Sequence, residues 1–425
     1  MPDRGLQLNE WLARLETYSP HEIDLGLERV QLMLQRLALT LPATVIHVAG
    51  TNGKGSSVAM LDACLRTTGD CVGSYTSPHL LRFNERIRVN GVEATDDEIV
   101  AAFEVVEARR DGVPLTYFEF GTLAALVIFA ERSVDVAILE VGLGGRLDAV
   151  NAIEPSVSLI TNVALDHCDW LGDNVEAIAA EKAGVMRSEK PAVFAAADLP
   201  RAITAKAESV GAELFVGNRD YRWSVEDGTW SWQFDDLALD GLERPSLPGD
   251  MQVQNAAGTL MVLAAAGFDH LLEVGLINSV LTRLELPGRA QTVADRFVVD
   301  VAHNPAAATA LADAVGRIGT GRAAVTILGM LDDKDVSGVV TELDALTDHW
   351  IAVGVDSPRA FQAEELARQV ANATDRPCWI AASMDQAIAR ATEISETWET
   401  ILITGSFYTV GAALVILAAA GNEHG

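Results

Sequence analysis

The stretch Val48–Ser57 reads VAGTNGKGSS and places Lys54 inside a glycine-rich turn between an apolar run and an amphipathic segment. Glycines let backbone N–H groups turn inward around phosphate oxygens, and a lysine adds a positive charge. A helix that begins near Ser56 would direct its positive end at the same point. The stretch therefore predicts a phosphate-binding loop between a strand and a helix, and with it a nucleotide-using enzyme.

The spacing of this loop differs from the common G-x-x-x-x-G-K-[ST] pattern. Only Thr51 and Asn52 separate its first two glycines, and Gly55 stands between Lys54 and Ser56. A plain glycine turn with a chance lysine is the alternative interpretation. The order of strand, loop and helix favours phosphate binding.

Length and charge narrow the class of protein. With 425 residues the chain exceeds one ordinary core, and we expect two domains, 1–286 and 287–425. The formal net charge of −29 would repel nucleic-acid backbones and anionic lipid surfaces, so we expect neither as a partner. Anionic substrates would need local basic groups, for which the candidates are Lys54, Arg82, Arg86, Arg88 and Arg289. Solvated surface is the alternative for most of these arginines.

The sequence also favours a cytoplasmic protein. The segment Met1–Leu6 lacks the basic region and apolar core of a secretory signal, and no apolar run reaches the roughly 20 residues that span a bilayer. The four cysteines show no metal-type spacing and are too sparse for a disulfide framework, so we interpret them as reduced packing residues.

Strand-like and helix-like segments alternate through the first domain. We expect strands at Thr44–Ala49, Val136–Val141, Ser156–Val163 and Ala192–Ala195, and helices at Ser56–Thr67, Asp96–Arg109, Phe120–Glu131 and Val175–Met186. This α/β alternation is typical of a mostly parallel sheet with helices on both faces. The segment Tyr221–Leu242 carries alternating aromatic residues around Asp227-Gly228, and we expect a hairpin appended to the main sheet.

The alternation restarts after Leu286-Pro287-Gly288-Arg289, where proline and glycine break a helical pattern. We expect a smaller, Rossmann-like α/β domain with strands near Arg296–Val301, Ala324–Leu328, Trp350–Val353 and Thr400–Thr404, and helices at Pro305–Ile318, Ala363–Ala371, Met384–Ile394 and Tyr408–Ala420.

Polar residues follow the expected strands of the first domain, and ligands of open parallel sheets bind beyond the carboxyl ends of the strands. Ser77, Glu140 and His167 stand at such ends and offer two oxygens and an imidazole. These groups suit Mg²⁺ that bridges nucleotide phosphates, so we expect them to be metal ligands. Three nearby glycines, at 142, 144 and 145, also allow a dinucleotide-binding interpretation, but no capping-helix pattern follows them in register.

Serial motifs carry a resemblance to a known family. They are GTNGKGS at 50–56, TSPH at 76–79, EVGLGGRLD at 140–148, DH at 166–167, EKAG at 181–184, NAA at 255–257, PGR at 287–289, DVAHNP at 300–305, DKD at 333–335 and GS at 405–406. Their order resembles the Mur ligase superfamily, and most of all its folate branch, the bifunctional dihydrofolate synthases/folylpolyglutamate synthases. The resemblance covers essentially the whole chain.

The resemblance implies an ATP-dependent amide ligase, which phosphorylates a carboxylate and lets the amino group of L-glutamate displace the phosphate. Two magnesium ions, held by Ser77, Glu140 and His167, are implied as cofactors, with ATP as cosubstrate. The implied ATP-binding residues are Gly50, Thr51, Asn52, Gly53, Lys54, Gly55, Ser56, Asn255, Arg289, Asp300 and His303. The implied catalytic residues are Lys54, His167 and Lys182.

Two positions need comment. Lys182 matches a lysine that is carbamylated in the family, and as N6-carboxylysine it would support the second metal; the sequence alone indicates an ordinary lysine on a helix face. Val301 stands where the family usually has glycine. A β-branched residue disfavours a positive φ, so either this backbone position is ordinary here or the loop is shifted.

The resemblance also implies a pterin site. Its residues would be Asp24, Arg82, Thr116, Tyr117, Phe118, Glu119, Leu147, Asp148 and Ala149. An apolar slot with an aromatic side chain and a carboxylate suits a flat heteroaromatic ring that carries N–H donors. The alternative is that Tyr117, Phe118 and Phe120 are helix-face core residues.

The expected small-molecule partners are ATP, L-glutamate, dihydropteroate and reduced folates, with a monomeric chain. A monofunctional folylpolyglutamate synthase and a Mur-type ligase that acts on a cell-wall precursor are alternatives within the enzymes. A nucleotide-dependent switch or binding module is the alternative outside them.

Overall fold

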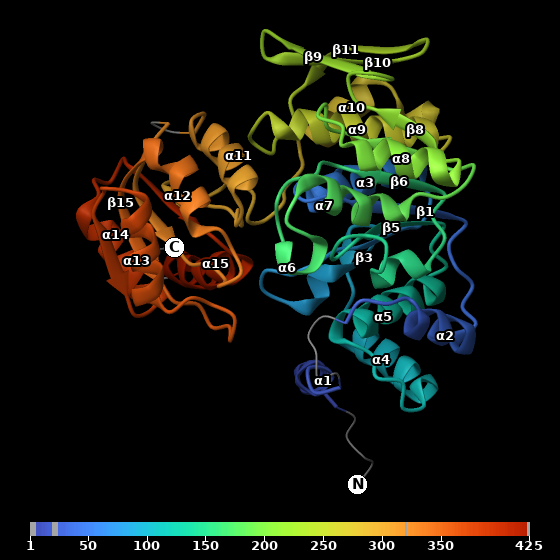
Figure 1. Cartoon of the computed structure of the whole chain (residues 1–425), viewed down its shortest axis with the longest axis horizontal. Coiled ribbons are helices and arrows are strands. Elements are labelled where there is room, and N and C mark those ends of the chain that lie inside the picture. Colours follow the sequence, from blue (N-terminus) through green and yellow to red (C-terminus); the bar gives the residue numbers. More distant parts are fainter. Residues whose placement is uncertain (1–5, 19–23, 319–320, 423–425) are drawn as a thin grey trace. The chain divides into compact units, whose positions relative to one another are not determined.

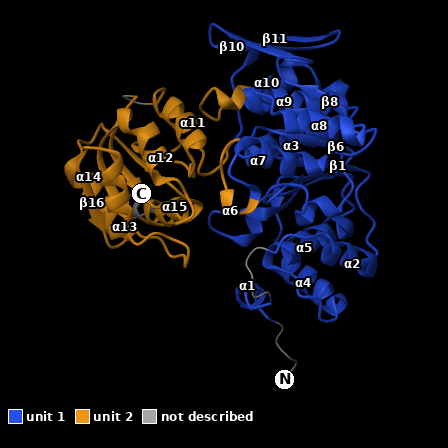
Figure 2. Cartoon of the chain, viewed as in Figure 1, with its two compact units in different colours: residues 1–163, 171–244, 254–284 blue, residues 164–170, 245–253, 285–425 orange. Residues whose placement is uncertain are grey.

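The structure is a computed structural model that describes residues 6–18, 24–318 and 321–422, and the chain falls into two compact units (Figures 1 and 2). Unit 1 comprises residues 1–163, 171–244 and 254–284, and unit 2 comprises residues 164–170, 245–253 and 285–425. The assignment of separate functional domains to 1–286 and 287–425 stays a prediction. The absence of a signal was inferred from Met1–Leu6, of which Met1–Gly5 lie outside the described residues.

Unit 1 contains the main sheet and the helices around it. Its strands are β1 (Thr44–Ala49), β2 (Val72–Tyr75), β3 (Ile87–Val89), β4 (Val92–Glu93), β5 (Val136–Glu140), β6 (Val157–Ile160), β7 (Pro191–Phe194) and β8 (Glu213–Val216). Its helices are α1 (Leu8–Leu15), α2 (Glu28–Leu37), α3 (Lys54–Leu65), α4 (Asp96–Arg110), α5 (Tyr117–Glu131), α7 (Val175–Lys182), α8 (Arg201–Val210), α9 (Met251–Ala265) and α10 (Val274–Leu281).

Short helical turns lie between these elements. They are η1 (Arg66–Thr68), η2 (Phe83–Arg86), η3 (Ala149–Ala152), η4 (Ala183–Val185), η5 (Asp269–Leu271) and the single α-helical turn α6 (Cys168–Leu171).

The main sheet has the strand order β4-β3-β2-β5-β1-β6-β7-β8. Strands β2 and β5 to β8 run parallel to β1, while β3 pairs antiparallel with β2 and β4 pairs antiparallel with β3. Val48 of β1 pairs with Glu140 of β5 and with Leu159 of β6, so these strands end at the same level. The loops after β2, β5, β1 and β6 therefore leave from one edge of the sheet, as expected for a ligand-binding edge.

Helices cover both faces of this sheet. A core cluster between the sheet and α4, α5 and α8 includes Phe103, Leu139 and Ile203. On the other face α3 packs against β1, β2 and β5, and Gly258 of α9 lies against Leu159. Figure 1 shows α4 and α5 below the sheet and α9 and α10 above it. A sheet buried on both faces needs continuous apolar strands, which explains the run Val45, Ile46 and Val48 in β1.

The aromatic segment after residue 220 differs from its prediction. It forms the strands β9 (Arg222–Glu226), β10 (Thr229–Phe234) and β11 (Leu237–Glu243). The expected hairpin around Asp227-Gly228 is confirmed as β9 and β10, but β11 adds a third antiparallel strand and the three form a sheet of their own, so the expected attachment to the main sheet is wrong. Trp230 and Trp232 are buried, and the indole N–H of Trp232 donates to the Ala257 carbonyl at 3.2 Å. The tryptophans are therefore packing residues that hold this sheet on α9.

Unit 2 is built on a second sheet, with the order β12-β13-β17-β14-β15-β16. Its strands are β12 (Gln291–Val293), β13 (Phe297–Val299), β14 (Ala323–Leu328), β15 (Thr347–Val353), β16 (Cys378–Ala381) and β17 (Thr400–Thr404). Its helices are α11 (Pro305–Val315), α12 (Val336–Leu343), the short η6 (Asp344–Leu346), α13 (Ala363–Ala373), α14 (Met384–Ile394) and α15 (Phe407–Asn422).

All strands of this sheet except β12 run parallel. Helices α11, α12 and α13 share one core cluster with it, while α14 and α15 pack against β14, β15 and β17. Both predicted α/β architectures are thus confirmed. None of the helices in the described part of the chain combines the length and apolar character needed to cross a membrane.

Candidate active site

The loop between β1 and α3 is fixed by contacts that only glycine permits. Gly50 and Gly53 have φ values of 147° and 83°. A Cβ on Gly50 would lie 1.8 Å from the Thr161 hydroxyl oxygen, and a Cβ on Gly53 would lie 2.6 Å from the Asn255 amide oxygen. The left-handed backbone and the close neighbours both exclude larger residues. The loop is therefore held in one shape before any ligand binds.

The segment after β6 anchors this loop from the neighbouring strand. The Thr51 N–H donates to the Asn162 carbonyl at 3.0 Å, and the Asn52 N–H donates to the Asn162 side-chain oxygen at 3.0 Å. The Thr161 hydroxyl donates to the Asn52 carbonyl at 2.6 Å. Sequence analysis gave Asn162 no role, because it lay inside the expected strand Ser156–Val163, whereas the observed strand β6 ends at Ile160.

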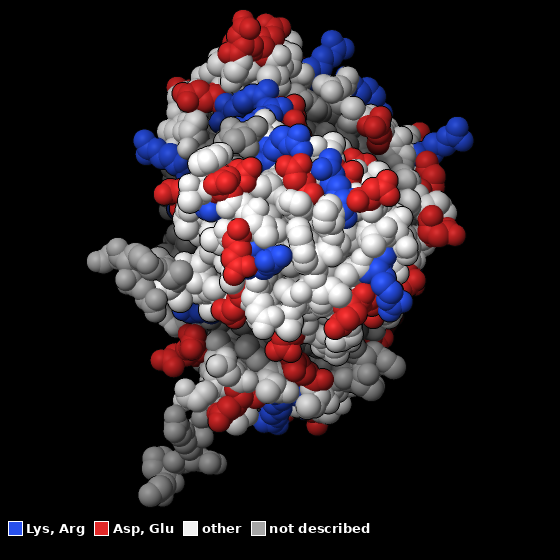
Figure 3. All heavy atoms as spheres, turned by 90° about the vertical axis from the view of Figure 1, so that its left-hand side faces the viewer, with Lys and Arg blue, Asp and Glu red and all other residues white. Residues whose placement is uncertain are grey.

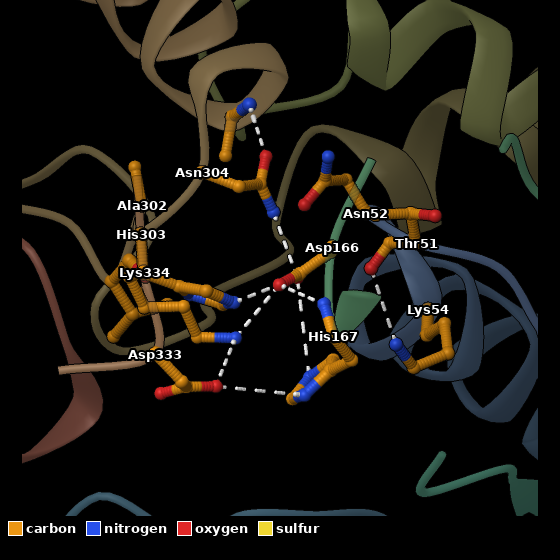
Figure 4. A network of polar contacts seen from close by, with 12 residues as sticks. Thr51, Asn52, Lys54, Asp166, His167, Ala302, His303, Asn304, Asp333 and Lys334 are labelled. Atoms are coloured by element: carbon orange, nitrogen blue, oxygen red, sulfur yellow. Dashed lines mark hydrogen bonds and ion pairs between the residues drawn. The ribbon is translucent and has the colours of Figure 1, made fainter. Parts of the chain in front are cut away.

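Two lysines converge on one carbonyl of the loop. Lys54 Nζ lies 3.1 Å from the Gly50 oxygen and 3.2 Å from the Thr51 oxygen, and Figure 4 shows the second of these bonds. Lys182 Nζ, at the end of α7, donates to the same Gly50 oxygen at 3.0 Å. Lys182 is buried although it was expected on a helix face. The two ammonium groups concentrate positive charge at the loop, as binding of an anionic phosphate requires.

Close packing between two motifs sets the position of Lys182. A Cβ on Gly145 would lie 2.9 Å from the carbonyl oxygens of Glu181 and Lys182, so the 140–148 loop touches the backbone at the end of α7. The Arg146 N–H donates to the Glu181 carbonyl at 2.9 Å. The serial motifs at 140–148 and 181–184 thus form one local structure.

Ser77 and Glu140 lie together at the ends of β2 and β5. The Ser77 N–H donates to Glu140 Oε2 at 3.2 Å, and Glu140 is buried. A hydroxyl and a carboxylate are the hard oxygen donors that Mg²⁺ prefers, and this ion keeps several waters. Within the described residues no group of three or more His, Cys, Asp or Glu side chains could hold a metal. The pair therefore fits Mg²⁺ only as a partial ligand set that water or phosphate completes.

His167 belongs to unit 2, where Asp166 is the centre of a polar network (Figure 4). Asp166 Oδ1 accepts from Lys334 Nζ at 2.7 Å, and Oδ2 accepts from the Asn304 amide at 3.0 Å and lies 3.3 Å from His303 Nε2. Burial raises the pKa of Asp166, but the hydrogen bond from His303 and the charges of His303, His167 and Lys334 outweigh it and hold the pKa well below its usual range. The carboxylate is thus a permanent anion.

Asp333 is the second carboxylate of this network. It lies 3.4 Å from Lys334 Nζ, 3.4 Å from the Arg359 guanidinium and 4.0 Å from His167 Nδ1. Sequence reasoning quoted Asp166, Asp333 and Lys334 within motifs but gave them no role. Their place within these motifs was the one available signal.

The other residues expected to contact ATP lie near the start of the second sheet. Asp300 accepts from the N–H groups of Ala290 and Ala302, each at 2.7 Å. Burial raises the pKa of Asp300, and the charge of Arg289 opposes this shift. The Arg289 guanidinium lies 5.5 Å from the Phe407 ring centroid. Val301 is not among the described non-glycine residues with a positive φ, so the backbone is ordinary at this position.

Most of the expected pterin residues gather around the start of α5. Arg29 bridges Asp24 and Glu119, at 2.9 and 3.0 Å, and the Gly26 N–H donates to the Leu147 carbonyl at 3.2 Å. Phe118 packs so closely on the 140–148 loop that a Cβ on Gly142 would lie 2.7 Å from its ring. Sequence reasoning missed Arg29.

Two of the expected pterin residues cap a helix. Thr116 accepts from the Glu119 N–H at 3.2 Å, and Glu119 accepts from the Thr116 N–H at 2.8 Å, which is a complete capping box. Arg82 lies apart from this group. It is exposed, with its side chain 3.4 Å from Asn84 and 4.0 Å from Asp96.

Asp148 is the buried carboxyl group of this region. It accepts from the N–H groups of Leu143, at 2.9 Å, and Val150, at 3.0 Å. Burial raises the pKa of Asp148 to about 7, against the opposing effects of these backbone hydrogen bonds and of the Lys54 charge. The group can therefore donate or accept a hydrogen bond near neutral pH.

Comparison with known proteins identifies the family. Residues 48–263 match the Mur ligase middle domain, and residues 283–407 match the Mur ligase glutamate ligase domain. The dihydrofolate synthase/folylpolyglutamate synthase of Escherichia coli is 39% identical over 98% of this chain and 97% of its own, and that of Mycobacterium tuberculosis is 32% identical over 92% and 90%. The chain belongs to the dihydrofolate synthase/folylpolyglutamate synthase family of Mur ligases.

Solved structures of this family share the fold. E. coli FolC in complex with DHPP and ADP matches with a TM-score of 0.92 at 38% identity, over 99% of this chain and 100% of its own. The Yersinia pestis enzyme complexed with AMPPNP and Mn ion matches with a TM-score of 0.89 at 38% identity and the same coverage. The predicted family, fold and class of ATP-dependent ligase are confirmed.

Proposed function

We propose that the chain joins L-glutamate to dihydropteroate, giving dihydrofolate, and to the glutamate tail of reduced folates, through an acyl phosphate formed with ATP. The observation that carries this proposal is the convergence of Lys54 and Lys182 on the Gly50 carbonyl, at the sheet edge where Ser77 and Glu140 also lie. Cationic and hard oxygen groups at one edge suit transfer of a phosphoryl group.

ATP binding is assigned to the loop Gly50–Ser56 and to Asn255, Arg289, Asp300 and His303. The rigid loop supports this assignment, because backbone N–H groups that are already oriented need no reorganisation when phosphate binds. The relatives crystallised with ADP, or with AMPPNP and Mn ion, support it independently. One further relative was solved with Mn, AMPPNP and L-glutamate bound. AMPPNP is an analogue of the cosubstrate ATP, and L-glutamate is the amine that the reaction requires.

We assign divalent-metal binding to Ser77, Glu140 and His167. We propose further that the metal is Mg²⁺ and that two ions bind. Bound Mg²⁺ would neutralise charge on the transferring phosphoryl group. Lys54 adds a further positive charge there. The unmodified side chain of the buried Lys182 is a cation that donates to the Gly50 carbonyl. Carbamylation would replace this cation by an anion, which would bind a metal ion instead of a phosphate.

The acceptor is assigned to the region of Asp24, Thr116 to Glu119 and Leu147 to Ala149, with Arg82 as a more distant contributor. The half-buried ring of Phe118, whose centroid lies 6.0 Å from that of the buried Tyr75, supplies apolar surface for a flat ring. Asp148 would bind the polar edge of a pterin. The E. coli relative solved with DHPP supports a folate precursor as the acceptor.

An acceptor panel tests this function. Purified protein with Mg-ATP and L-glutamate is given dihydropteroate, tetrahydrofolate or a UDP-muramyl acceptor, and phosphate release and product mass are measured. The proposal predicts glutamate-dependent product with the first two. Product from tetrahydrofolate alone would establish a monofunctional folylpolyglutamate synthase, and turnover of the muramyl acceptor alone would contradict the proposal. The monomeric state and the cytoplasmic location stay predictions.

A further inference from the structure

Arg86 is an almost fully buried arginine at the acceptor region, and the proposed function assigns it no role. It is the last residue of η2, directly before β3, and is 8% exposed. Its carbonyl accepts from the Thr76 N–H at 2.9 Å, which ties it to the end of β2, one residue before Ser77. Arg86 therefore stands next to the sheet edge at which the reaction is assigned.

Aromatic side chains surround its guanidinium group. Cζ lies 5.3 Å from the Phe83 ring centroid and 5.5 Å from the Tyr117 ring centroid. Burial raises the pKa of the Tyr75 phenol, and the charges of Arg86 and Asp148 act on it in opposite directions. The guanidinium thus lies among residues that also border the assigned acceptor region, Tyr75 and Tyr117.

No carboxylate of the described chain lies within 4.0 Å of this guanidinium. Nε donates to His79 Nδ1 at 2.8 Å, and the pKa of His79 is lowered to about 4 by burial and by Arg86, so this partner is neutral. The neighbouring Glu85 is engaged elsewhere, because its oxygens accept from three backbone N–H groups. A buried cation without an anion is costly unless a ligand provides one.

The two neighbouring arginines considered from sequence, Arg82 and Arg88, differ in burial or in their partners. Arg88 is paired with Glu93 at 3.0 Å, and Arg82 is exposed. The half-buried Arg29, which contacts Glu119 of α5, has two carboxylate partners. Arg86 combines deep burial, an aromatic surround and the lack of a carboxylate.

We propose that Arg86 binds the carboxylate of the aromatic acid that serves as acceptor. This assignment rests on the proposed function. An aryl carboxylate would place its ring beside the aromatic side chains and its two oxygens against the planar guanidinium, which can donate two parallel N–H bonds. The same positive charge would stabilise the acyl phosphate that forms from that carboxylate. Arg86 is thus a substrate-binding residue that selects an acid over its neutral analogues.

Binding without ATP tests the assignment. Titration calorimetry compares dihydropteroate with its carboxamide, which keeps the ring system and lacks the charge. Wild-type protein is expected to bind the acid at least about tenfold more tightly, as a fully made charge-assisted bidentate contact implies. Arg86→Gln is expected to bind acid and amide equally, and Arg86→Lys to recover part of the preference. The KM for L-glutamate is expected to stay within about twofold, because its carboxylates are not the ligand.

Arg132→Gln is the matched control, since Arg132 of the same unit is exposed and paired with Glu98. Circular dichroism and thermal melting confirm that each variant is folded. If Arg86→Gln prefers the acid over the amide as strongly as wild type does, the assignment is overturned. It is also overturned if wild-type protein binds acid and amide equally, a result that requires no variant. A wild-type protein that neither binds nor turns over dihydropteroate would overturn the proposed function together with this inference.

Discussion

At the scale of single residues, the phosphate loop depends on two lysines with different surroundings. Lys54 starts α3 and bonds to the carbonyls of its own loop, while Lys182 reaches the same loop from the end of α7. Lys54 is thus positioned by its own loop, whereas the position of the buried Lys182 depends on the packing at the end of α7.

Lys54→Ala is expected to lower kcat/KM by roughly 100- to 1,000-fold or more, because one preorganised charge on the transferring group is lost. The fold should be kept, since the hydrogen bonds of the Lys54 side chain in the described structure go to carbonyls of its own loop. Steady-state kinetics with Mg-ATP measure the change, with circular dichroism as the folding control. Substantial residual ligation by folded Lys54→Ala would show that the loop does not carry the assigned role.

Asp148 should make stability depend on pH. Its pKa is raised to about 7 by burial, against an ordinary value of 3.8. Between these values the folded chain keeps a proton that the unfolded chain releases. The stabilising contribution is therefore complete below the ordinary pKa and is lost as the pH rises through about 7.

Wild type and Asp148→Asn should be compared by denaturant unfolding across this range. The free energy of unfolding of wild type should fall relative to that of the variant by up to about 1.4 kcal/mol for each pH unit. The amide does not titrate and so serves as the reference. Parallel curves for the two proteins would contradict the raised pKa.

Sequence predicted the site residues whose signal is local. Ser77 and Glu140 were found because they stand at the ends of strands, and the structure brings them together. The contacts of Arg29 and Arg86 could not be found in this way. Arg29 pairs with a carboxylate 90 positions away. Arg86 stands out because it is buried without a carboxylate partner among the described residues, which only the folded structure shows. The ionisation of Asp148 likewise follows from burial, which no short motif encodes.

At the scale of elements, two helices of unit 1 begin in the same way but have different surroundings. Helix α4 has a capping box of Thr95 and Glu98, and α5 has one of Thr116 and Glu119. Only α5 starts inside the assigned acceptor region. The pair therefore separates the stability of a helix from the geometry of a site.

Thr95→Ala and Thr116→Ala are each expected to lower the free energy of unfolding by about 1 kcal/mol, because each removes one cap. Only Thr116→Ala should also raise the KM for dihydropteroate, by a factor of several, since the first turn of α5 carries Tyr117 and Phe118. Chemical denaturation and acceptor kinetics measure the two effects. A similar rise in KM for both variants would remove α5 from the acceptor site.

Elements with strong patterns were predicted closely, and weakly patterned ones were not. The bounds of β1, α14 and β17 agree with the expected ranges, because β1 and β17 are apolar and α14 keeps a clear helical period. Strand β11 was not predicted as a separate third strand, since Asp240 and Gly241 are unfavourable in strands. Strand β16 pairs only with β15, and its exposed Ile380 breaks the expected apolar pattern.

At the scale of the whole molecule, the net charge of −29 contrasts with the cationic groups at the loop. On the face drawn in Figure 3, acidic and basic side chains alternate around an area of uncharged residues, so the charge there is not gathered into one field. The proposed binding of anions therefore depends on local groups such as Lys54 and Lys182. Divalent metal should matter for the same reason, because it offsets phosphate charge.

Mg-ATP is accordingly expected to raise the melting temperature, in line with about 2.7 kcal/mol of stabilisation at a ligand concentration of 100 times Kd. Removal of the metal with EDTA should reduce the shift strongly, and Lys54→Ala should reduce it as well. Differential scanning calorimetry measures all three. An undiminished shift in EDTA would contradict metal-assisted nucleotide binding.

The central claim is that ATP activates the carboxylate of the acceptor before glutamate attacks. Transfer of oxygen-18 tests it directly: dihydropteroate labelled in its carboxylate is converted with Mg-ATP and L-glutamate, and the released phosphate is analysed by mass spectrometry. The account predicts one labelled oxygen in each phosphate released, because the bond from carbonyl carbon to the bridging oxygen breaks when the amine attacks. Unlabelled phosphate accompanying labelled amide product would contradict it.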